Sequence, residues 1–153
     1  MSTTADDRTF AVRVPKSVVA GEPIRIDAEF RNSGTDVVTI DVSNLDLPPV
    51  FVQVRTATGE PAPLTRFGES VLGAGRLKAL LRRGGSSIAF PIAQNDSIPF
   101  VVRNLALYYD LTLPGEYTVT VSRSFRIGEN LREAKIQEVV VGPIPFTVVR
   151  QNK

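Results

Sequence analysis

Strict alternation of apolar and charged residues in one segment is the feature that most constrains what this chain can fold into. Residues 24–31 read Ile-Arg-Ile-Asp-Ala-Glu-Phe-Arg. Because successive side chains of a β-strand point to opposite faces, this order gives one apolar face and one charged face. The segment therefore predicts a β-strand that covers a core on one side and meets water on the other.

The same two-residue period recurs along most of the chain. Apolar residues two positions apart mark seven further segments: residues 10–14, 38–42, 50–54, 88–92, 100–102, 117–121 and 144–148. Turn sequences rich in Gly, Pro, Asn and Asp separate many of these segments, for example at residues 20–23, 32–36, 58–61 and 113–115. Short strands with such turns between them are typical of antiparallel sandwiches. We therefore predict an all-β fold, an antiparallel β-sandwich of seven to nine strands.

The connection from Pro61 to Gly85 is the least regular part of the chain. Its best helical candidate, Leu72–Leu81, has leucines at helical spacing but also contains Gly73 and Gly75. Each glycine costs a helix about 1 kcal/mol relative to alanine, so we predict a loop or a single turn here. Long connections in compact domains are often functional or mobile, which makes this segment a candidate binding loop.

Arg123 interrupts the apolar face of its own strand. The inward register of residues 117–121 continues through Arg123 to Phe125. An unpaired arginine in an apolar core would be too costly to keep. We favour a β-bulge, or a strand that runs past the end of the core, and the alternative is a buried ion pair, for which Glu138 is a candidate partner.

The chain contains no His and no Cys. Catalytic Ser-His-Asp and Cys-His systems, His-ligated zinc and thiolate metal sites are therefore excluded. The glycine-rich sequences GxxxxGK(S/T) and GxGxxG that bind nucleotide phosphates do not occur either. We predict that the protein is not an enzyme and uses no cofactor.

Carboxylate pairs are the remaining route to catalysis, because glycoside hydrolysis needs only two of them in a cleft. Glu60 and Glu69 lie in the long connection, and Asp110 and Glu116 flank a Pro-Gly turn. We interpret all four as solvated turn residues, with Asp110 capping the turn that precedes it.

A calcium site is the metal site that carboxylates alone could supply. Asp41, Asp46 and Asp96 lie near predicted strand ends but lack the clustered spacing of a calcium loop. We interpret them as surface residues and predict no metal site.

Charge and hydropathy limit the partners of the chain. Its 18 basic and 16 acidic residues leave a net charge of +2, without the concentrated basic stripe of a nucleic-acid-binding protein. No apolar run approaches the roughly 20 residues that a membrane span needs. The first ten residues are polar and acidic, which is unlike a signal peptide. We expect a cytoplasmic protein or an extracytoplasmic domain whose leader has been removed.

One segment near the end of the chain resembles a known family. Leu113-Pro114-Gly115-Glu116-Tyr117 is similar to the tyrosine corner of immunoglobulin-like and fibronectin-type-III-like domains. The resemblance implies that Tyr117 opens the penultimate strand and that its hydroxyl bonds to the backbone of the preceding turn. Pro114, Gly115 and Tyr117 are then structural residues.

Two further segments extend this resemblance. Residues 141–148, Val-Gly-Pro-Ile-Pro-Phe-Thr-Val, look like the interrupted last strand of such modules, because proline cannot donate to a central ladder. Residues 20–24 and 30–34 are similar to the opening strands. The chain thus resembles bacterial immunoglobulin-like modules of uncharacterised function and, more distantly, a small intracellular proteinase inhibitor of bacilli. The resemblance implies a non-catalytic domain over residues 8–150, after a flexible tail at residues 1–7, with a structural or protein-interaction role.

The long connection also carries a cluster of like charges. Arg76, Lys78, Arg82 and Arg83 have no acidic residue among them. One interpretation is a contact for an anionic ligand or surface, and the favoured one is a solvated loop. A second candidate function is proteinase inhibition through the 61–85 loop.

Carbohydrate binding ranks below protein binding because the chain has no Trp on which a sugar ring could stack. Tyr108 and Tyr109, in the turn that Asp110 is expected to cap, are the only adjacent tyrosine pair. We expect one of them in the core and the other partly exposed. A protein is therefore the expected partner.

Overall fold

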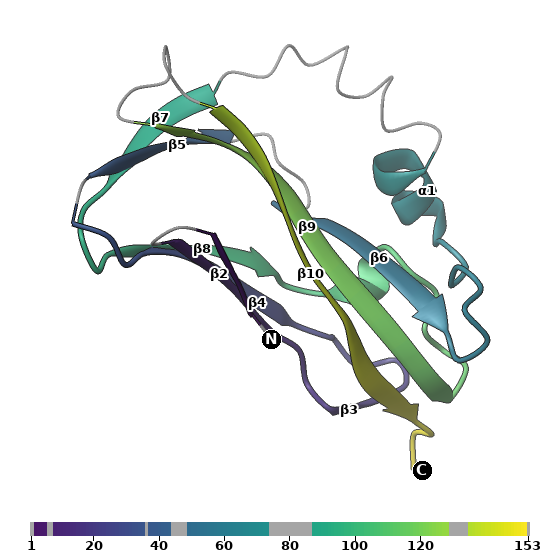
Figure 1. The fold of residues 1–153 in the computed structure, drawn as a ribbon. Helices are drawn as coiled ribbons and strands as arrows, with labels where there is room; N and C mark the ends of the chain where they lie inside the picture. The colour runs from purple at the N-terminus through teal and green to yellow at the C-terminus, as the bar shows by residue number, and fades with distance from the viewer. Residues whose placement is uncertain are drawn as a thin grey trace.

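Two β-sheets packed face to face make up the computed structural model of this chain (Figure 1). The structure describes residues 2–5, 8–35, 37–43, 49–73, 87–128 and 135–152. The four-stranded sheet has the order β1 (Ser2–Ala5), β2 (Arg8–Arg13), β4 (Ile26–Asn32) and β8 (Ser97–Val102). The six-stranded sheet has the order β3 (Ser17–Val19), β10 (Lys135–Val149), β9 (Gly115–Gly128), β5 (Val38–Ser43) and β7 (Ser87–Ile92), with β6 (Phe51–Thr56) also paired to β9.

Strand β9 organises the six-stranded sheet. One of its edges pairs with β10, and the other pairs with β6 and then with β5. Both β5 and β6 run antiparallel to β9, with Ile40 opposite Ile127 and Phe51 opposite Ser122. These two strands therefore follow one another along the same edge of β9.

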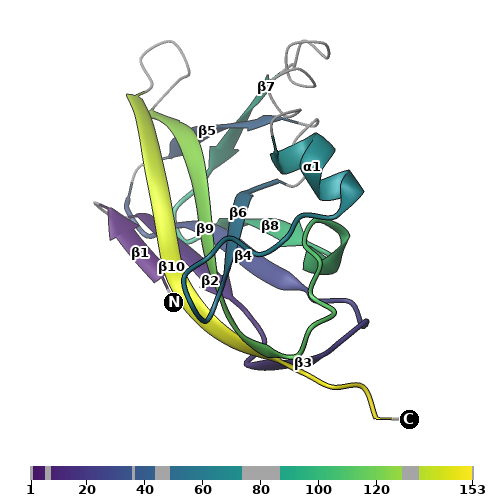
Figure 2. The ribbon, with the colours of Figure 1, turned by 90° about the vertical axis from the view of Figure 1, so that its right-hand side faces the viewer.

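The chain passes from one sheet to the other at a proline between β2 and β3. Strand β2 pairs with β4 as far as Arg13, and the chain then passes through Pro15 to β3, which pairs in parallel with β10 from Ser17. Pro15 has no N–H to offer a ladder, so the pairing with β4 ends there. Figure 2 shows β3 beside the C-terminal end of β10.

Two sheets with a switching first strand and a final β9–β10 hairpin confirm the predicted fold class. The chain is an all-β, immunoglobulin-like sandwich. The strand count was wrong, because the described residues form ten strands, and β3 is parallel to its neighbour. Part of the predicted tail, Ser2–Ala5, forms strand β1 and pairs with β2. The limits of the domain at residues 8–150 stay a prediction.

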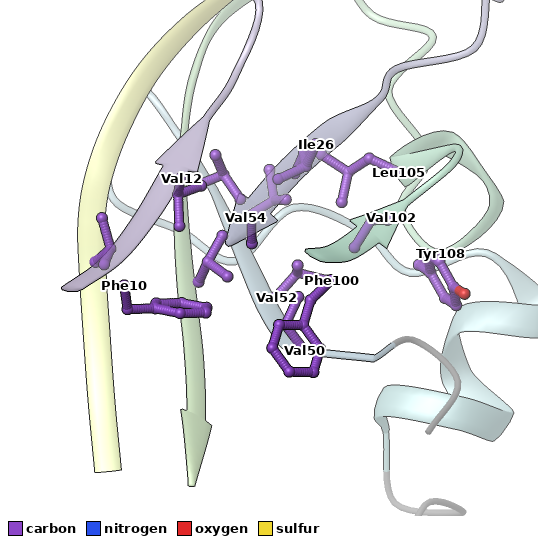
Figure 3. Close-up of a cluster of buried hydrophobic side chains, with 14 of the residues drawn as sticks. Phe10, Val12, Ile26, Val50, Val52, Val54, Phe100, Val102, Leu105 and Tyr108 are labelled. Carbon is purple, nitrogen blue, oxygen red and sulfur yellow. The ribbon is translucent and has the colours of Figure 1, made fainter. Parts of the chain in front are cut away.

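The core lies between the sheets and follows the predicted alternation. Ile26, Ala28 and Phe30 of β4 are buried, while Asp27 and Glu29 are half-buried on its other face. Figure 3 shows inward side chains from both sheets meeting there. Four phenylalanines from four strands form its aromatic centre: Phe10, Phe30, Phe100 and Phe125.

Phe90 departs from the predicted core. The pattern of residues 88–92 puts it on the core face, and it does lie opposite Ile40, which is fully buried. Yet 45% of Phe90 is exposed. The reason is its strand, because β7 ends the order of its sheet and no further described strand covers the side chain.

Arg123 is held among aromatic rings. Its guanidinium donates to the carbonyl oxygen of Pro49 and lies 4.6 Å from the ring centroid of Phe100 and 5.3 Å from that of Phe125. Cation–π contacts of this kind compensate part of the cost of removing the charge from water.

The sequence-based interpretations of Arg123 as a bulge, as a strand end beyond the core or as the partner of Glu138 are wrong. The pairing of β9 with β10 has no register shift between residues 121 and 127, so no bulge lies at Arg123. Phe125 is fully buried, so the core continues beyond Arg123. Val139 lies opposite Arg123, which places the exposed Glu138 on the other face of β10. The ion pair with Glu138 is therefore wrong as well.

A short helix, α1 (Arg66–Leu72), lies in the first half of the long connection, ahead of the segment considered for a helix in the sequence. Thr65 caps it, because its side-chain oxygen accepts from the N–H of Gly68. The same hydroxyl donates to the carbonyl of Leu107 in the 3₁₀ helix η1 (Leu105–Leu107). The candidate segment Leu72–Leu81 lies, beyond residue 73, outside the described residues, so the loop or single turn expected there stays a prediction.

Both tyrosines that precede Asp110 are buried, so the expectation that one is partly exposed was wrong. Tyr108 is 5% exposed and packs against Phe67 of α1, with 5.5 Å between ring centroids. Tyr109 is 6% exposed and donates its hydroxyl to the carbonyl of Val52, at 3.0 Å. The helix and strand β6 thus cover one tyrosine each.

The hydrogen bond predicted for Tyr117 is confirmed. Its hydroxyl donates to the carbonyl oxygen of Leu113, at 2.7 Å, across the turn that contains Pro114 and Gly115. Gly115 has a φ of 151°, which other residues rarely adopt. Burial raises the pKa of the Tyr117 hydroxyl, so the group stays a donor at neutral pH.

Replacing Tyr117 with phenylalanine should lower the free energy of unfolding by about 1 kcal/mol, the usual net contribution of one hydrogen bond. The ring and its stacking on Phe146 remain in this variant. Urea unfolding of the two proteins would measure the difference. Identical midpoints and slopes would show that the Leu113 bond does not stabilise the turn.

Asp110 caps the turn that follows it rather than the one that precedes it. Its Oδ1 accepts from the N–H of Thr112, at 3.2 Å, and from the Thr112 hydroxyl, at 2.7 Å. These hydrogen bonds to Thr112 lower the pKa of the Asp110 carboxyl from its ordinary value of 3.8.

The lowered pKa predicts how stability at Asp110 depends on pH. A carboxyl with a lower pKa in the folded state contributes stability above its unfolded-state pKa and loses it as the pH falls through the folded-state value. The stability difference between the wild type and Asp110→Ala should therefore be constant at neutral pH and shrink below about pH 4. Unfolding curves from pH 2 to 7 would measure it, with Asp110→Asn as the control that keeps an acceptor without a charge. A difference that did not change with pH would contradict the assignment.

Candidate functional site

The sequence-predicted binding residues and the described structure do not overlap. Arg76, Lys78, Arg82 and Arg83 lie outside the described residues. The structure therefore neither brings these four side chains together nor separates them.

The carboxylates weighed in the sequence lie mostly on the surface. Those whose side chains the structure describes are exposed: Glu60, Glu69, Asp96, Asp110 and Glu116. The side chains of Asp41 and Asp46 lie outside the described residues. The part of the chain that the structure describes holds no group of three or more residues able to bind a metal ion.

A groove of about 750 Å³ lies where the chain crosses between the sheets, from β2 to β3. We call it the crossover groove. It is lined by Val12, Arg13, Val14, Lys16, Thr56, Ala57, Glu116, Tyr117, Thr118, Ile144, Pro145, Phe146 and Thr147. Ligand-binding clefts in proteins usually enclose about 300–1,000 Å³, so this groove is large enough to hold part of a partner.

Two features of the chain create the groove. On one side, the chain leaves the four-stranded sheet after Arg13, and the N–H of Thr147 bonds to the carbonyl of Lys16 at 2.9 Å. On the other side, the pairing of β10 with β9 shifts register between Val141 and Ile144. Residues from both places, Arg13 to Lys16 and Ile144 to Thr147, line the groove.

Gly142 allows the interruption of β10. Its φ is 128°, and a Cβ atom there would lie 2.8 Å from the carbonyl oxygen of Val119. Only glycine fits so close an approach in this conformation. The interruption that Pro143 and Pro145 predicted for the last strand is thus confirmed.

The groove has an apolar floor. Val12, Tyr117 and Phe146 are buried beneath it, and Val14 and Ile144 are half-buried at its surface. Half-buried aliphatic side chains are those that a partner can cover further, with a gain of about 25 cal/mol per Å² of apolar surface.

Charged side chains stand at the rim of the groove. Arg13 and Lys16 are exposed where the chain passes from β2 to β3, and Glu116 is exposed at the start of β9. Asp27, which lies opposite Arg13 in the sheet, instead pairs with Arg25 at 2.9 Å. No described side chain forms an ion pair with Arg13 or Lys16. Both cations are therefore available to a partner.

Sequence reasoning missed this groove because its lining comes from four separate segments, near residues 14, 56, 117 and 145. Nothing in the order of the residues says that these segments meet. The available signal was the pair of proline interruptions, Pro15 on one strand and Pro143 and Pro145 on the other, which mark where two edges cannot pair.

Comparison with known proteins leaves the family open. No known protein family matches the sequence. No curated protein matches it either. Among solved structures, the chain is similar to ASH/PapD-like domain 7 of human CEP192, with 12% identity over 98% of this chain and 92% of that chain and a TM-score of 0.40.

A second similarity is to a β-glucosidase from Listeria innocua, solved in complex with gluconolactone. It has 16% identity and a TM-score of 0.30 over 87% of this chain, which spans only 16% of the enzyme. Neither match supports an argument about function, so the function has to be inferred from the residues of the chain itself. Within the described residues, no helix is long and apolar enough to cross a membrane.

Proposed function

We propose that this chain is a non-catalytic β-sandwich module that binds a protein partner through the crossover groove. The observation that supports it most directly is the combination of a half-buried apolar floor with cations at the rim that no described side chain engages. Interfaces between proteins commonly have an apolar centre and a polar rim, and the rim charges speed and orient association. Val14 and Ile144 would form the centre, and Arg13 and Lys16 the rim.

Charge reversal at the rim tests the proposal without disturbing the core. The double variant Arg13→Glu/Lys16→Glu changes two exposed side chains, and Arg31→Glu/Arg103→Glu is the matched control, with the same charge change at exposed positions outside the groove. The immobilised wild type should capture a specific protein from cells that express it. The groove variant should lose that protein and the control should retain it, as quantitative mass spectrometry would measure. Equal capture by all three proteins would overturn the proposal.

Proteinase inhibition through the 61–85 loop is less well supported. The first half of this segment is tied to the sandwich by the Thr65 cap, by α1 and by backbone bridges from Arg55 to Pro61 and from Leu64 to Tyr109. An inhibitory loop has to present an extended backbone to a protease cleft, and a helix does not. A panel of serine proteinases and metallopeptidases assayed with excess protein would detect inhibition.

Binding of an anionic ligand through Arg76, Lys78, Arg82 and Arg83 is a separate proposal. It rests on the sequence cluster alone. Reversing the charges of Arg82 and Arg83 would abolish binding to heparin or to anionic vesicles if these residues form the contact, and would leave capture through the crossover groove unchanged.

A further inference from the structure

We infer that the crossover groove receives an amphipathic helix with acidic residues on its polar flank, rather than an extended strand. The inference rests on the proposed function and specifies the partner. Three properties of the groove lead to it: the missing backbone donors along β10, the apolar floor, and the sign of the charges at the rim.

The edge of β10 that faces the groove offers a strand no N–H donors. Strand β3 occupies this edge only from Thr147 to Val149, and the N–H of Thr147 already bonds to Lys16. Alternate residues of a strand direct their backbone groups to the same edge, so the next such position is Pro145. Pro145 has no N–H, and Pro143 lies in the interruption beyond it.

A strand added at this edge would leave its own carbonyl groups without donors. Backbone groups that lose water and find no partner cost about 1–3 kcal/mol each, which disfavours strand addition here. A helix satisfies its backbone internally and needs only side-chain contacts from its receptor. The prolines of β10 therefore select a helix as the occupant.

The floor of the groove suits one face of such a helix. Val14 and Ile144 are half-buried aliphatic residues of the lining that come from two separate segments, and Ala57, also in the lining, is exposed and small. A helix places apolar residues at i, i+3, i+4 and i+7 on one face, which gives a narrow apolar stripe. That stripe would cover the two aliphatic side chains while the remaining faces of the helix stay in water.

The charges at the rim determine which charges the helix should carry beside its apolar stripe and in which direction it inserts. Arg13 and Lys16 together supply two positive charges, and Glu116 supplies one negative charge. Glutamate or aspartate residues beside the apolar stripe would face the two cations, and a basic residue would face Glu116. A helix inserted in the opposite direction would bring like charges together, which costs affinity.

Two peptide libraries displayed on phage test the inference with the protein as it is. One library has a helix-forming frame with one randomised face, and the other carries a proline at every fourth position and cannot form a helix. Each is selected on the wild-type protein after depletion on Ala57→Trp, a variant in which an exposed lining residue becomes large enough to obstruct part of the groove.

Enrichment should come from the helical library, with Asp and Glu beside an apolar stripe. The enriched peptides should bind Arg13→Glu/Lys16→Glu about tenfold or more weakly and bind Arg31→Glu/Arg103→Glu as tightly as the wild type. Replacing their acidic residues with lysine should restore binding to the groove variant. Enrichment from the proline library, enrichment of basic sequences, or binding that survives both groove variants would overturn the inference.

The outcome separates this inference from the proposed function. If the wild type captures a cellular protein in a groove-dependent manner while the helical library yields no binder, the helix is wrong and the protein-binding groove stands. If neither capture nor selection depends on the groove residues, both proposals fail.

Discussion

Replacing Phe125 with alanine is expected to lower the free energy of unfolding by about 3–5 kcal/mol, the range for large aromatic residues removed from a core. Phe125 is fully buried, and its ring contacts all three other phenylalanines of the aromatic centre, Phe10, Phe30 and Phe100. Its ring centroid lies 5.6 Å from that of Phe10, 4.9 Å from Phe30 and 5.7 Å from Phe100. It also lies under the guanidinium of Arg123.

The loss should exceed a simple transfer cost because two interactions fail together. The four aromatic side chains come from β2, β4, β8 and β9, so the cavity would lie between the two sheets and could not close without moving one of them. The same substitution also removes one of the two rings that stabilise the charge of Arg123.

Chemical unfolding of Phe125→Ala measures this loss, and Phe90→Ala is its control. Phe90 is also a phenylalanine, but it lies on strand β7 at the end of its sheet and is 45% exposed, so its truncation should cost about half as much. Equal losses for the two variants would show that the aromatic cluster does not anchor the sandwich.

The sequence predicted the sandwich because the core face of most strands has a strict two-residue period. Ile26 and Phe30, or Val52 and Val54, are buried where the alternation puts them. Position along a strand decides whether a side chain faces the core or water, so the order of the residues is sufficient to predict which side chains are buried. Tyr117 was predictable for a similar reason, because its hydrogen-bond partner is only four residues away.

Features that depend on a contact between distant segments were not predictable in this way. Arg123 is tolerated because Pro49 and Phe100 lie beside it, and neither is near it in the sequence. The crossover groove needs Val14 and Ile144, which are 130 positions apart in the chain (144 − 14), to line the same space. The alternation of residues predicts on which face of its strand a side chain lies. Which distant residues that side chain contacts is determined only when the sheets assemble.

Helix α1 was not predicted, although its sequence contains a short local signal for a helix start. The sequence Thr65-Arg-Phe-Gly-Glu69 starts with a good capping residue and has an acidic residue in the first turn. Gly68 obscures it, since glycine is a poor helix former. The structure explains this glycine, because it is buried where the helix meets the backbone of Tyr108.

Replacing Gly68 with alanine should therefore destabilise the protein by about 2–3 kcal/mol, in the upper part of the range for overpacked positions. A Cβ atom at this position would lie 1.8 Å from the carbonyl oxygen of Tyr108 and 2.6 Å from its carbonyl carbon. Backbone atoms cannot rotate away as a flexible side chain can, so α1 would have to move by more than 1 Å, from 1.8 Å to at least 3.0 Å. The bonds of Thr65 to Tyr108 and Leu107 would lengthen or break.

The sign of the change distinguishes this close approach from helix propensity. In a helix with open space around it, glycine to alanine stabilises by about 1 kcal/mol, so Gly68→Ala would then raise the midpoint of unfolding. A loss at Gly68, together with little change for Ser70→Ala on the exposed side of the same helix, would show that α1 is held against η1 by direct backbone contact. A gain at Gly68 would show instead that α1 can leave η1 without cost. In that case the 61–72 segment would not be anchored, and the argument against an inhibitory loop would lose its basis.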